Sequence, residues 1–174
     1  QKPDSRFVND GVKLLEELGA IPLKRDKAGI KLTELGKKLA RLPIDPRLAR
    51  MVLFGADNGA LNELLVLAAA LSIQDPRERP LDKQQKADEL HGRFADPDSD
   101  FASWLKLWRY LQEQQDSQTN NQFRRLCKQE LLNYLRVREW QDLYAQLSQV
   151  AEELALKSNS TAADYQSLHT AILT

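Results

Sequence analysis

Apolar residues recur every three or four positions along most of the chain, which is the spacing of one face of an α-helix. The first such face ends at Gly19, where a glycine can take up the left-handed conformation that commonly closes a helix. The most apolar stretch, 60–73, is hydrophobic nearly all round, which is typical of a helix at the centre of a core. The pattern predicts helices over residues 5–18, 46–58, 60–73, 82–94, 100–115, 120–132 and 137–156.

The stretch 32–53 adds local signals for a helix, a break and a second helix. The hydroxyl of Thr33 can accept a hydrogen bond from a free N–H in the first turn of a short helix. Pro43 stops that helix, because the residue before a proline is pushed out of the α region. Asp45 and Pro46 then supply the N-cap and the first residue of the next helix. We therefore expect two helices joined by a proline elbow.

Two short alternating runs, 21–24 and 30–32, flank the turn sequence 26–29, whose glycine can supply a positive φ. This predicts a small β-hairpin, the wing of a winged-helix domain that also includes the helices on either side. The chain begins at Gln1 without Met, and a capping box at Thr161 and Asp164 starts a further helical pattern before the end. We therefore expect a piece of a longer protein.

The composition narrows the class of protein. Hydrophobic residues make up 42% of the chain, which is enough to build a core. The net charge is zero, which disfavours a free-standing nucleic-acid binder but allows a module that lines one wall of a channel. Cys127 is the single cysteine, so no internal disulfide can form and the cytoplasm is the expected compartment. The longest apolar run, 64–71, is too short to cross a membrane.

Two motif-like stretches suggest nucleotide chemistry but lack its context. The sequence D-E-L-H at 88–91 spells the metal-binding box of a helicase motor, which works at the end of a buried strand, whereas the residues before it read as a charged helix. Gly36-Lys37 lacks the earlier glycine and the following Ser or Thr of a P-loop. The two histidines and the cysteine have no metal-ligand spacing. We expect no catalytic, cofactor or metal site in this chain.

The aromatic residues on the later helices allow two interpretations. Side chains of this kind stack on bases in proteins that bind single strands. Their helical spacing favours core packing instead. Cys127 is likewise expected to be a small core residue rather than a nucleophile. The aromatic residues concerned are Trp104, Trp108, Trp140 and Tyr144.

The basic residues are a better functional signal. Between 122 and 138, five of them stand against one acid, so this segment carries five minus one, or +4. Such a cluster suits a wall facing phosphates, where charge contacts position a strand without reading its sequence. A solvated face or a docking surface for other domains is an open alternative. Two further arginines stand in the proline-stiffened loop 74–80. The candidate nucleic-acid-binding residues are Arg77, Arg79, Arg124, Arg125, Lys128, Asn133, Arg136 and Arg138.

The run LTELGKKLARLPIDPRLARMVL, at 32–53, resembles the junction between the winged helix and the helicase-associated (ratchet) domain of DEAH-box ATP-dependent RNA helicases, in the form of the bacterial HrpA-like members. That family shows an LT-x-LG start and an LP-[IL]-[DE]-P elbow. LSIQDPRERP, at 71–80, is similar to the family's ratchet loop S-x-Q-x-x-F-x-RP and departs from it at Arg77 or Glu78. Two later family segments also have similar stretches here, ADELHGRFADPDSDFASWLKLWRYL and RLCKQELLNYLRVREWQDLYAQL. The first of them has Phe101 where the family usually has histidine. The resemblance covers residues 5–157.

This resemblance implies a mainly α chain with three parts: a partial winged helix in 1–45, a ratchet bundle of about seven helices in 46–157, and the start of a helix leading to a next domain in 158–174. It implies an accessory C-terminal region that forms part of a single-stranded nucleic-acid channel and couples motor-domain movement to strand translocation. ATP and Mg²⁺ would bind in the motor domains of the parent helicase, so this fragment would be inactive alone. The implied partners are single-stranded RNA, with DNA left open, the RecA-like motor domains and a downstream C-terminal domain, in a monomer away from membranes.

Two other functions compete with this one. Zero net charge and an incomplete winged helix also suit a helical protein-interaction adaptor without nucleic-acid binding. A winged-helix transcription regulator would need a basic recognition helix, and the helix after Thr33 offers Lys37, Lys38 and Arg41. A P-loop and a D-E-A-H box upstream of residue 1 would decide for the helicase.

Overall fold

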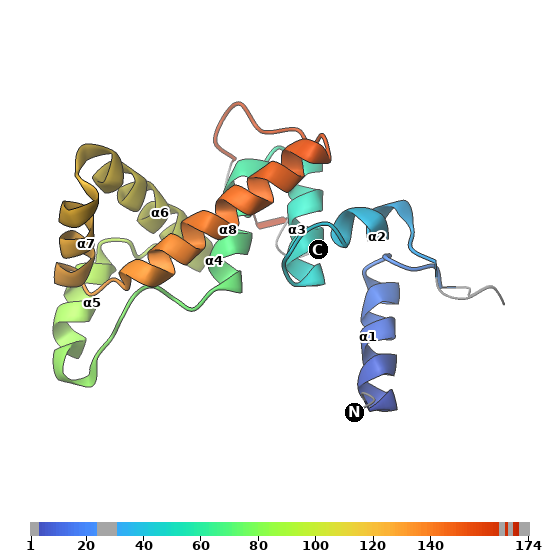
Figure 1. The fold of residues 1–174 in the computed structure, drawn as a ribbon, viewed down its shortest axis with the longest axis horizontal. Coiled ribbons are helices and arrows are strands. Elements are labelled where there is room, and N and C mark those ends of the chain that lie inside the picture. Colours follow the sequence, from blue (N-terminus) through green and yellow to red (C-terminus); the bar gives the residue numbers. More distant parts are fainter. Residues whose placement is uncertain (1–3, 24–30, 164–165, 167–168, 171–174) are drawn as a thin grey trace. The chain divides into compact units, whose positions relative to one another are not determined.

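The computed structural model describes residues 4–23, 31–163, 166 and 169–170, and these fold into eight α-helices and one 3₁₀-helix (Figure 1). The mainly helical class predicted from the sequence is confirmed. Contacts between residues divide the chain into two compact units: one comprises Gln1–Leu61 with Gln149–Thr174, the other Asn62–Ser148. The predicted boundaries at residues 45 and 157 stay a prediction.

The first helix of the first unit, α1 (Ser5–Glu17), lies where the periodicity predicts it. Gly19 closes it with φ +69°, as expected for a left-handed C-terminal residue. Its apolar face is buried only at the end next to this glycine, where Leu18 is 8% exposed, whereas Phe7 is 76% exposed and Val8 is 47% exposed. Periodicity predicts which residues share this face, but it does not predict how much of the face is buried against other described residues.

The next helix, α2 (Glu34–Leu39), is fixed to the turn after α1 by its N-cap. The Thr33 hydroxyl accepts from the Gly36 N–H at 2.9 Å and donates to the Gly19 carbonyl at 2.7 Å. The Thr33 N–H donates to the Ala20 carbonyl at 2.9 Å. The cap predicted from the sequence is confirmed, and the helix ends at Leu39, four residues before Pro43.

The third helix, α3 (Pro46–Asp57), begins as the Asp-Pro pair predicts. The Asp45 carboxylate accepts from the Arg47 N–H at 2.8 Å, and Pro46 occupies the first turn, where its missing N–H leaves no partner unsatisfied. Gly59 follows the helix end with φ +71°. Both ends are therefore set by residues adjacent to the helix in sequence.

The hairpin wing predicted for 21–32 is not seen. Residues 21–23 and 31–32, the described parts of its two arms, have no strand conformation, and the turn at 24–30 lies outside the described residues. The predicted capping box and last helix likewise depend on Asp164, Tyr165, Leu168 and Ile172, which also lie outside them.

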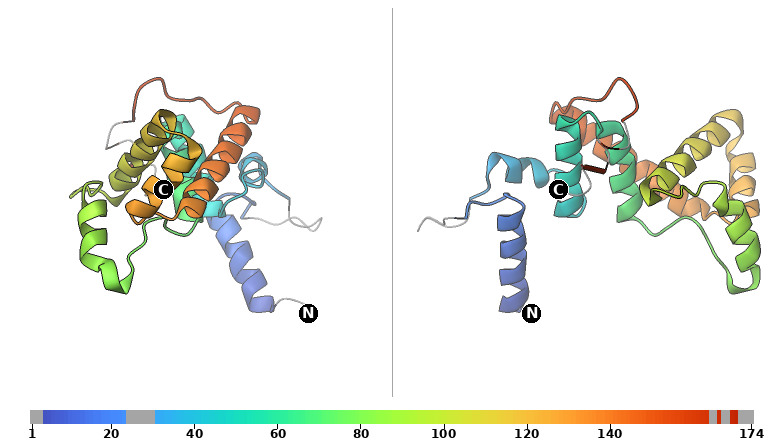
Figure 2. Two further views of the ribbon diagram at one scale, coloured as in Figure 1. Left: turned by 60° about the vertical axis from the view of Figure 1, so that its left-hand side comes forward. Right: turned by 180° about the vertical axis from the view of Figure 1, so that it is seen from behind.

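The second unit is built around α4 (Leu61–Ser72), as its uniform hydrophobicity predicts. Leu64, Leu67 and Ala68 are fully buried. The charged segment after it is split into a 3₁₀-turn and a shorter α-helix. Helices α6 and α7, which contact each other, are seen from two further sides in Figure 2. The remaining elements are η1 (Leu81–Lys83), α5 (Gln84–Gly92), α6 (Asp100–Ser117), α7 (Asn120–Gln129) and α8 (Tyr134–Glu153).

The aromatic side chains of α6 and α8 pack on one another. Trp140 is fully buried, its ring centroid is 5.4 Å from Trp104 and 4.8 Å from Trp108, and Trp108 is 4.9 Å from Tyr144. The Trp140 Nε1–H donates to the Val66 carbonyl of α4 at 3.0 Å. The core-packing interpretation is confirmed, since edge and tilted ring contacts of this kind are typical of a core.

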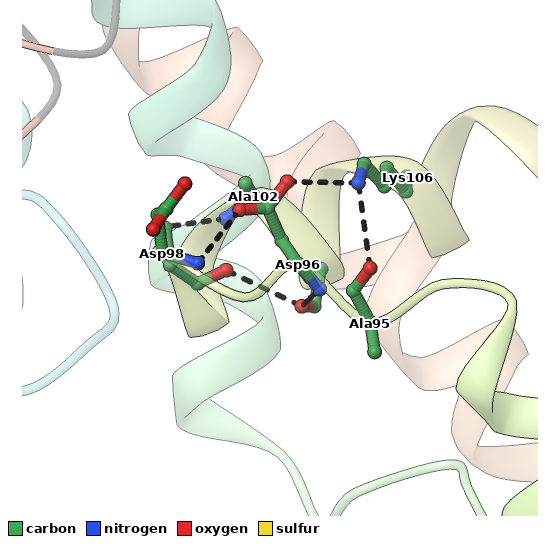
Figure 3. A network of polar contacts seen from close by, with 7 residues as sticks. Ala95, Asp96, Asp98, Ala102 and Lys106 are labelled. Carbon is green, nitrogen blue, oxygen red and sulfur yellow. Dashed lines mark hydrogen bonds and ion pairs between the residues drawn. The ribbon is translucent and has the colours of Figure 1, made fainter.

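A polar network sets the start of α6 (Figure 3). Ser99 is the N-cap and accepts from the Ala102 N–H at 3.2 Å. Asp96 accepts from the Lys106 ammonium at 2.8 Å and from the Asp98 N–H at 3.2 Å. These two donors, Lys106 first, hold the pKa of Asp96 below its ordinary value. The loop 95–99 is thereby tied to the first turns of the helix.

Replacing Lys106 by methionine is expected to raise the pKa of Asp96 toward its ordinary value, because the strongest donor to the carboxylate is removed. Since the pKa in the folded chain is depressed, this carboxylate stabilises the fold above its unfolded pKa, and the stabilisation is lost as the pH falls through the folded pKa. An NMR titration of the Asp96 carboxyl carbon measures the midpoint, with Lys86→Met on α5 as the control. An unchanged midpoint in Lys106→Met would contradict the assignment.

Cys127 is fully buried on α7, which confirms it as a core residue. Burial, with the nearby Glu130 charge, raises the pKa of its thiol to about 11. We expect a disulfide reagent at pH 8 to label the native chain roughly a hundredfold more slowly than the denatured chain, because the thiolate is the reactive form. Labelling of both forms at the same rate would show that the thiol is accessible.

No helix among the residues that the structure describes has the length and apolar content needed to cross a membrane.

Candidate nucleic-acid interface

The loop after α4 is pinned to the turn between α7 and α8. Arg77 and Leu132 form an antiparallel β-bridge. The Glu78 N–H donates to the Leu131 carbonyl at 2.8 Å, and the Asn133 N–H donates to the Pro76 carbonyl at 2.7 Å. Leu131 has φ +54°, an uncommon conformation for leucine that the bridge holds in place. These backbone bonds fix two segments more than fifty residues apart in one short ladder.

Asn133 has a structural role that the sequence did not reveal. Its side-chain oxygen accepts from the Arg136 N–H at 3.1 Å, so it acts as the N-cap of α8. Its Nδ2 donates to the Glu78 carboxylate at 2.8 Å. The cap explains why α8 begins at Tyr134 rather than at residue 137, where periodicity alone places it. Its predicted contact with nucleic acid stays a prediction.

Arg77 and Arg136 are both tied to Asp75. The Arg77 guanidinium makes a bidentate pair with the Asp75 carboxylate, at 3.0 Å through Nε and 2.8 Å through Nη2, and lies 4.4 Å from the centroid of the Trp104 ring. The Arg136 Nη1 donates to the Asp75 carbonyl at 3.0 Å. Both side chains are partly buried in these contacts, so they shape the loop and have fewer donors left for a phosphate.

Arg79 is exposed and makes a bidentate pair with Asp88 of α5, with both bonds at 2.7 Å. This pair raises the pKa of Arg79 and lowers the pKa of Asp88. Asp88 is the first residue of D-E-L-H, and the last, His91, has its Nε2 at 3.0 Å from the Glu130 carbonyl. The helical context predicted for D-E-L-H is confirmed, and no strand precedes it in the described chain.

Glu130, the C-cap of α7, connects three helices. It accepts from the Tyr110 hydroxyl of α6 at 2.8 Å and pairs with Arg93, the C-cap of α5. Arg93 lies against the Phe94 and Tyr110 rings, with centroid distances of 4.6 and 4.5 Å. Burial, followed by the bond to Glu130, raises the pKa of Tyr110. The one acid in the basic segment is therefore engaged in packing α5, α6 and α7 together.

A groove of about 440 Å³ opens beside this ladder, where η1, the end of α7 and the start of α8 meet. Arg124 and Lys128 extend from α7, and Lys83 extends from η1. The Arg124 guanidinium lies 5.8 Å from the centroid of the Tyr134 ring, which also lines the groove. Three cations against Glu78 give the lining a charge of three minus one, or +2. The other lining residues are Pro80, Leu131, Leu132, Asn133 and Leu135.

The remaining predicted residues lie elsewhere. Arg138 lines a second groove of about 410 Å³ together with Glu139 and Asp142, and its guanidinium is 3.8 Å from the Asp142 carboxylate. Arg125 is exposed on α7 and does not line either groove. The structure thus brings together Arg124, Lys128 and Asn133 from the predicted set. It adds Lys83, which sequence reasoning missed because the predicted helix 82–94 has as many acidic residues as lysines and arginines, three of each.

Two family models match the chain. The helicase associated domain (HA2), ratchet-like, matches residues 45–134, and the helicase associated domain (HA2), winged-helix, matches residues 11–44. The two matched ranges meet at the proline elbow between α2 and α3.

Several curated proteins are similar over nearly the whole chain. The ATP-dependent RNA helicase HrpA of Escherichia coli is 55% identical over 174 residues, 100% of this chain and 13% of that protein. An ATP-dependent RNA helicase HrpA homolog of Haemophilus influenzae is 56% identical over 98% of this chain and 13% of its own length. The DExH-box ATP-dependent RNA helicase DExH1 of Arabidopsis thaliana is 30% identical over 92% of this chain and 15% of its own length. The chain therefore spans only about an eighth of its bacterial relatives, and by the ratchet-like match over more than half of its residues it belongs to the helicase-associated (HA2) domain family.

Proposed function

We propose that this chain is an accessory region of a DEAH-box ATP-dependent RNA helicase and that its basic groove forms part of the wall of a single-strand nucleic-acid channel. The observation that carries the proposal is the convergence of Lys83, Arg124 and Lys128 on one groove in a chain with zero net charge. The similarity to RNA helicases over the full chain supports it.

The chemistry of the groove suits a polyanion. Lysine and arginine side chains bind phosphates by charge, and this contact carries no sequence information. The groove also lies at the N-terminus of α8, where backbone N–H groups and the helix dipole favour an anion. The Tyr134 ring, next to Arg124, offers a face on which a base can stack.

In this proposal, the energy that moves the strand comes from domains outside this chain. ATP and Mg²⁺ bind to RecA-like motor domains elsewhere in the parent protein, and a nucleotide-driven change between those domains advances the strand along the wall. Gly36-Lys37, the P-loop-like dipeptide, lies where α2 packs on a turn, and D-E-L-H is on a helix. The chain acts with motor domains and a downstream domain of the same polypeptide, in the cytoplasm and as a monomer.

Charge reversal in the groove tests the channel role. In the full-length protein, the triple variant Lys83→Glu, Arg124→Glu and Lys128→Glu is expected to weaken single-stranded RNA binding about tenfold and to reduce the dependence of log Kd on log salt by up to about 2, since each lost phosphate contact on a single strand contributes about 0.7. Fluorescence anisotropy at several salt concentrations measures both.

The matched control reverses three exposed cations that lie outside the groove: Lys13, Lys86 and Arg109. It changes the net charge equally and is expected to leave the salt slope near the wild-type value. Equal effects of the two triple variants, or wild-type binding by the groove variant, would remove the groove from the channel.

The alternative, a protein-interaction adaptor, is favoured by one observation in the first unit. Phe7 is 76% exposed on α1, and large apolar side chains that stay exposed often mark a contact surface. The adaptor role predicts that Phe7→Ser leaves RNA binding unchanged, and that the groove variant does so as well.

A further inference from the structure

Glu78 is an acid in a groove that otherwise attracts phosphates. It lines the groove with Lys83, Arg124 and Lys128, yet the structure gives it no ion pair with any of them among the described residues. The bond from its N–H to the Leu131 carbonyl holds its backbone beside the groove. A carboxylate at this place repels phosphates and so weakens their binding. It is therefore a candidate for a different contact with the strand, one that compensates for this repulsion.

The hydrogen bonds of Glu78 leave acceptor capacity free. One carboxylate oxygen accepts from Asn133 Nδ2 at 2.8 Å, and this bond orients the group. An ionised carboxylate has about four acceptor sites on its two oxygens and no donor. The other oxygen has no bond to a described protein group. The groove therefore presents one fixed acceptor among its cations.

A continuous nucleic-acid backbone has one kind of donor that such an acceptor can bind. Phosphates and deoxyribose offer only acceptors along the strand, whereas each ribose carries a 2′-hydroxyl, which donates and distinguishes RNA from DNA. Placing phosphates on the cations brings the neighbouring sugars to the same groove. The groove thus combines cations that can bind the phosphates of RNA or DNA with one acceptor for the 2′-hydroxyl, which only RNA carries.

We propose that Glu78 gives the groove a preference for ribose by accepting a hydrogen bond from a 2′-hydroxyl of the strand whose phosphates lie on Lys83, Arg124 and Lys128. This inference rests on the proposed function, because it needs a strand in the groove. Asn133 is the positioning residue, since its amide holds the carboxylate in place.

The test compares strands that differ only at the 2′ position. The full-length protein, wild type and Glu78→Ala, is titrated with single-stranded oligomers of uridine, of deoxyuridine and of 2′-fluoro-uridine, which lacks the donor but keeps a ribose-like sugar pucker. The base is the same in all three, so base contacts cancel. Glu78→Ala is expected to reduce the ratio of uridine to deoxyuridine affinity about tenfold, the size of a hydrogen bond to a charged group, while deoxyuridine binding tightens or stays the same. Wild-type protein should bind the 2′-fluoro strand like the deoxy strand.

Two further variants make the result specific. Glu78→Gln keeps an oxygen acceptor and is expected to retain part of the ribose preference. Asp82→Ala removes an acid of η1 that does not line the groove and should leave the ratio unchanged. If Glu78→Ala bound all three strands more tightly by the same factor, Glu78 would act only by repelling phosphates, and the inference would be overturned. That outcome is distinct from failure of the proposed function, which would appear as no effect of the Lys83, Arg124 and Lys128 triple variant on any strand.

Discussion

Replacing Trp140 by alanine is expected to lower the free energy of unfolding by about 3–5 kcal/mol. The side chain is fully buried, and it contacts the Trp104 and Trp108 rings of α6 as well as the Val66 carbonyl of α4. The substitution removes the apolar area of an indole, leaves a cavity between α4, α6 and α8, and removes the hydrogen bond that the indole N–H donates to the Val66 carbonyl. Urea denaturation followed by circular dichroism measures the loss.

Trp140→Phe separates packing from hydrogen bonding. Phenylalanine keeps much of the ring volume but cannot donate to the Val66 carbonyl, so its expected loss is smaller, about 1–3 kcal/mol. Leu135→Ala is the control, because this side chain is 74% exposed and its truncation should change stability by less than about 0.5 kcal/mol. If Trp140→Ala were as mild as Leu135→Ala, the aromatic cluster would not be the core of this unit.

The helix ends that could be predicted are those set by neighbouring residues. Thr33 and Asp45 cap their helices as expected, because a cap needs only a side-chain oxygen and the N–H groups two or three residues on. The start of α8 could not be predicted in this way. Its cap, Asn133, is held by bonds to Pro76 and Glu78, in a loop that no local pattern connects to it.

The same reason explains why the candidate site was only partly predictable. A run of basic residues shows where positive charge lies along the chain, but not which charges are already neutralised. Arg77 pairs with Asp75, and its flat guanidinium packs on the Trp104 ring. It does so at the position where the family's ratchet loop has an apolar residue. Lys83, which joins the groove, comes from a different segment, and only the tertiary structure brings it to Arg124 and Lys128.

The groove and the ladder both lie within the unit Asn62–Ser148. The bonds that close the ladder also set the position of Glu78 and the start of α8, both of which line the groove. In the proposed channel, the residues whose charges would contact a strand, Lys83, Arg124 and Lys128, therefore differ from those that hold the loop in place. Arg77 and Arg136 hold the loop by their bonds, which gives their substitution an expected effect on stability as well as on binding.

Gly36→Ala is expected to destabilise the first unit by about 2–4 kcal/mol, although alanine is the better helix former. A Cβ built at Gly36 would lie 2.1 Å from the Ala20 carbonyl oxygen and 2.9 Å from its carbon. Both are backbone atoms, so no side chain can rotate away to relieve the overlap. The start of α2 would have to move off the turn after α1 and break the bonds that Thr33 makes to Gly19 and Ala20. The glycine of the LT-x-LG sequence is thus required by a close approach between backbones.

Gly11→Ala on α1 is the matched control, because a Cβ there meets no atom within 4 Å. It should stabilise the chain by about 0.5–1 kcal/mol through helix propensity alone. Opposite signs for the same chemical change, measured by thermal and urea unfolding, would demonstrate the close approach directly. Equal stabilisation by both substitutions would mean that α2 can move away from Ala20 at no cost, and that the Thr33 cap does not hold the two segments together.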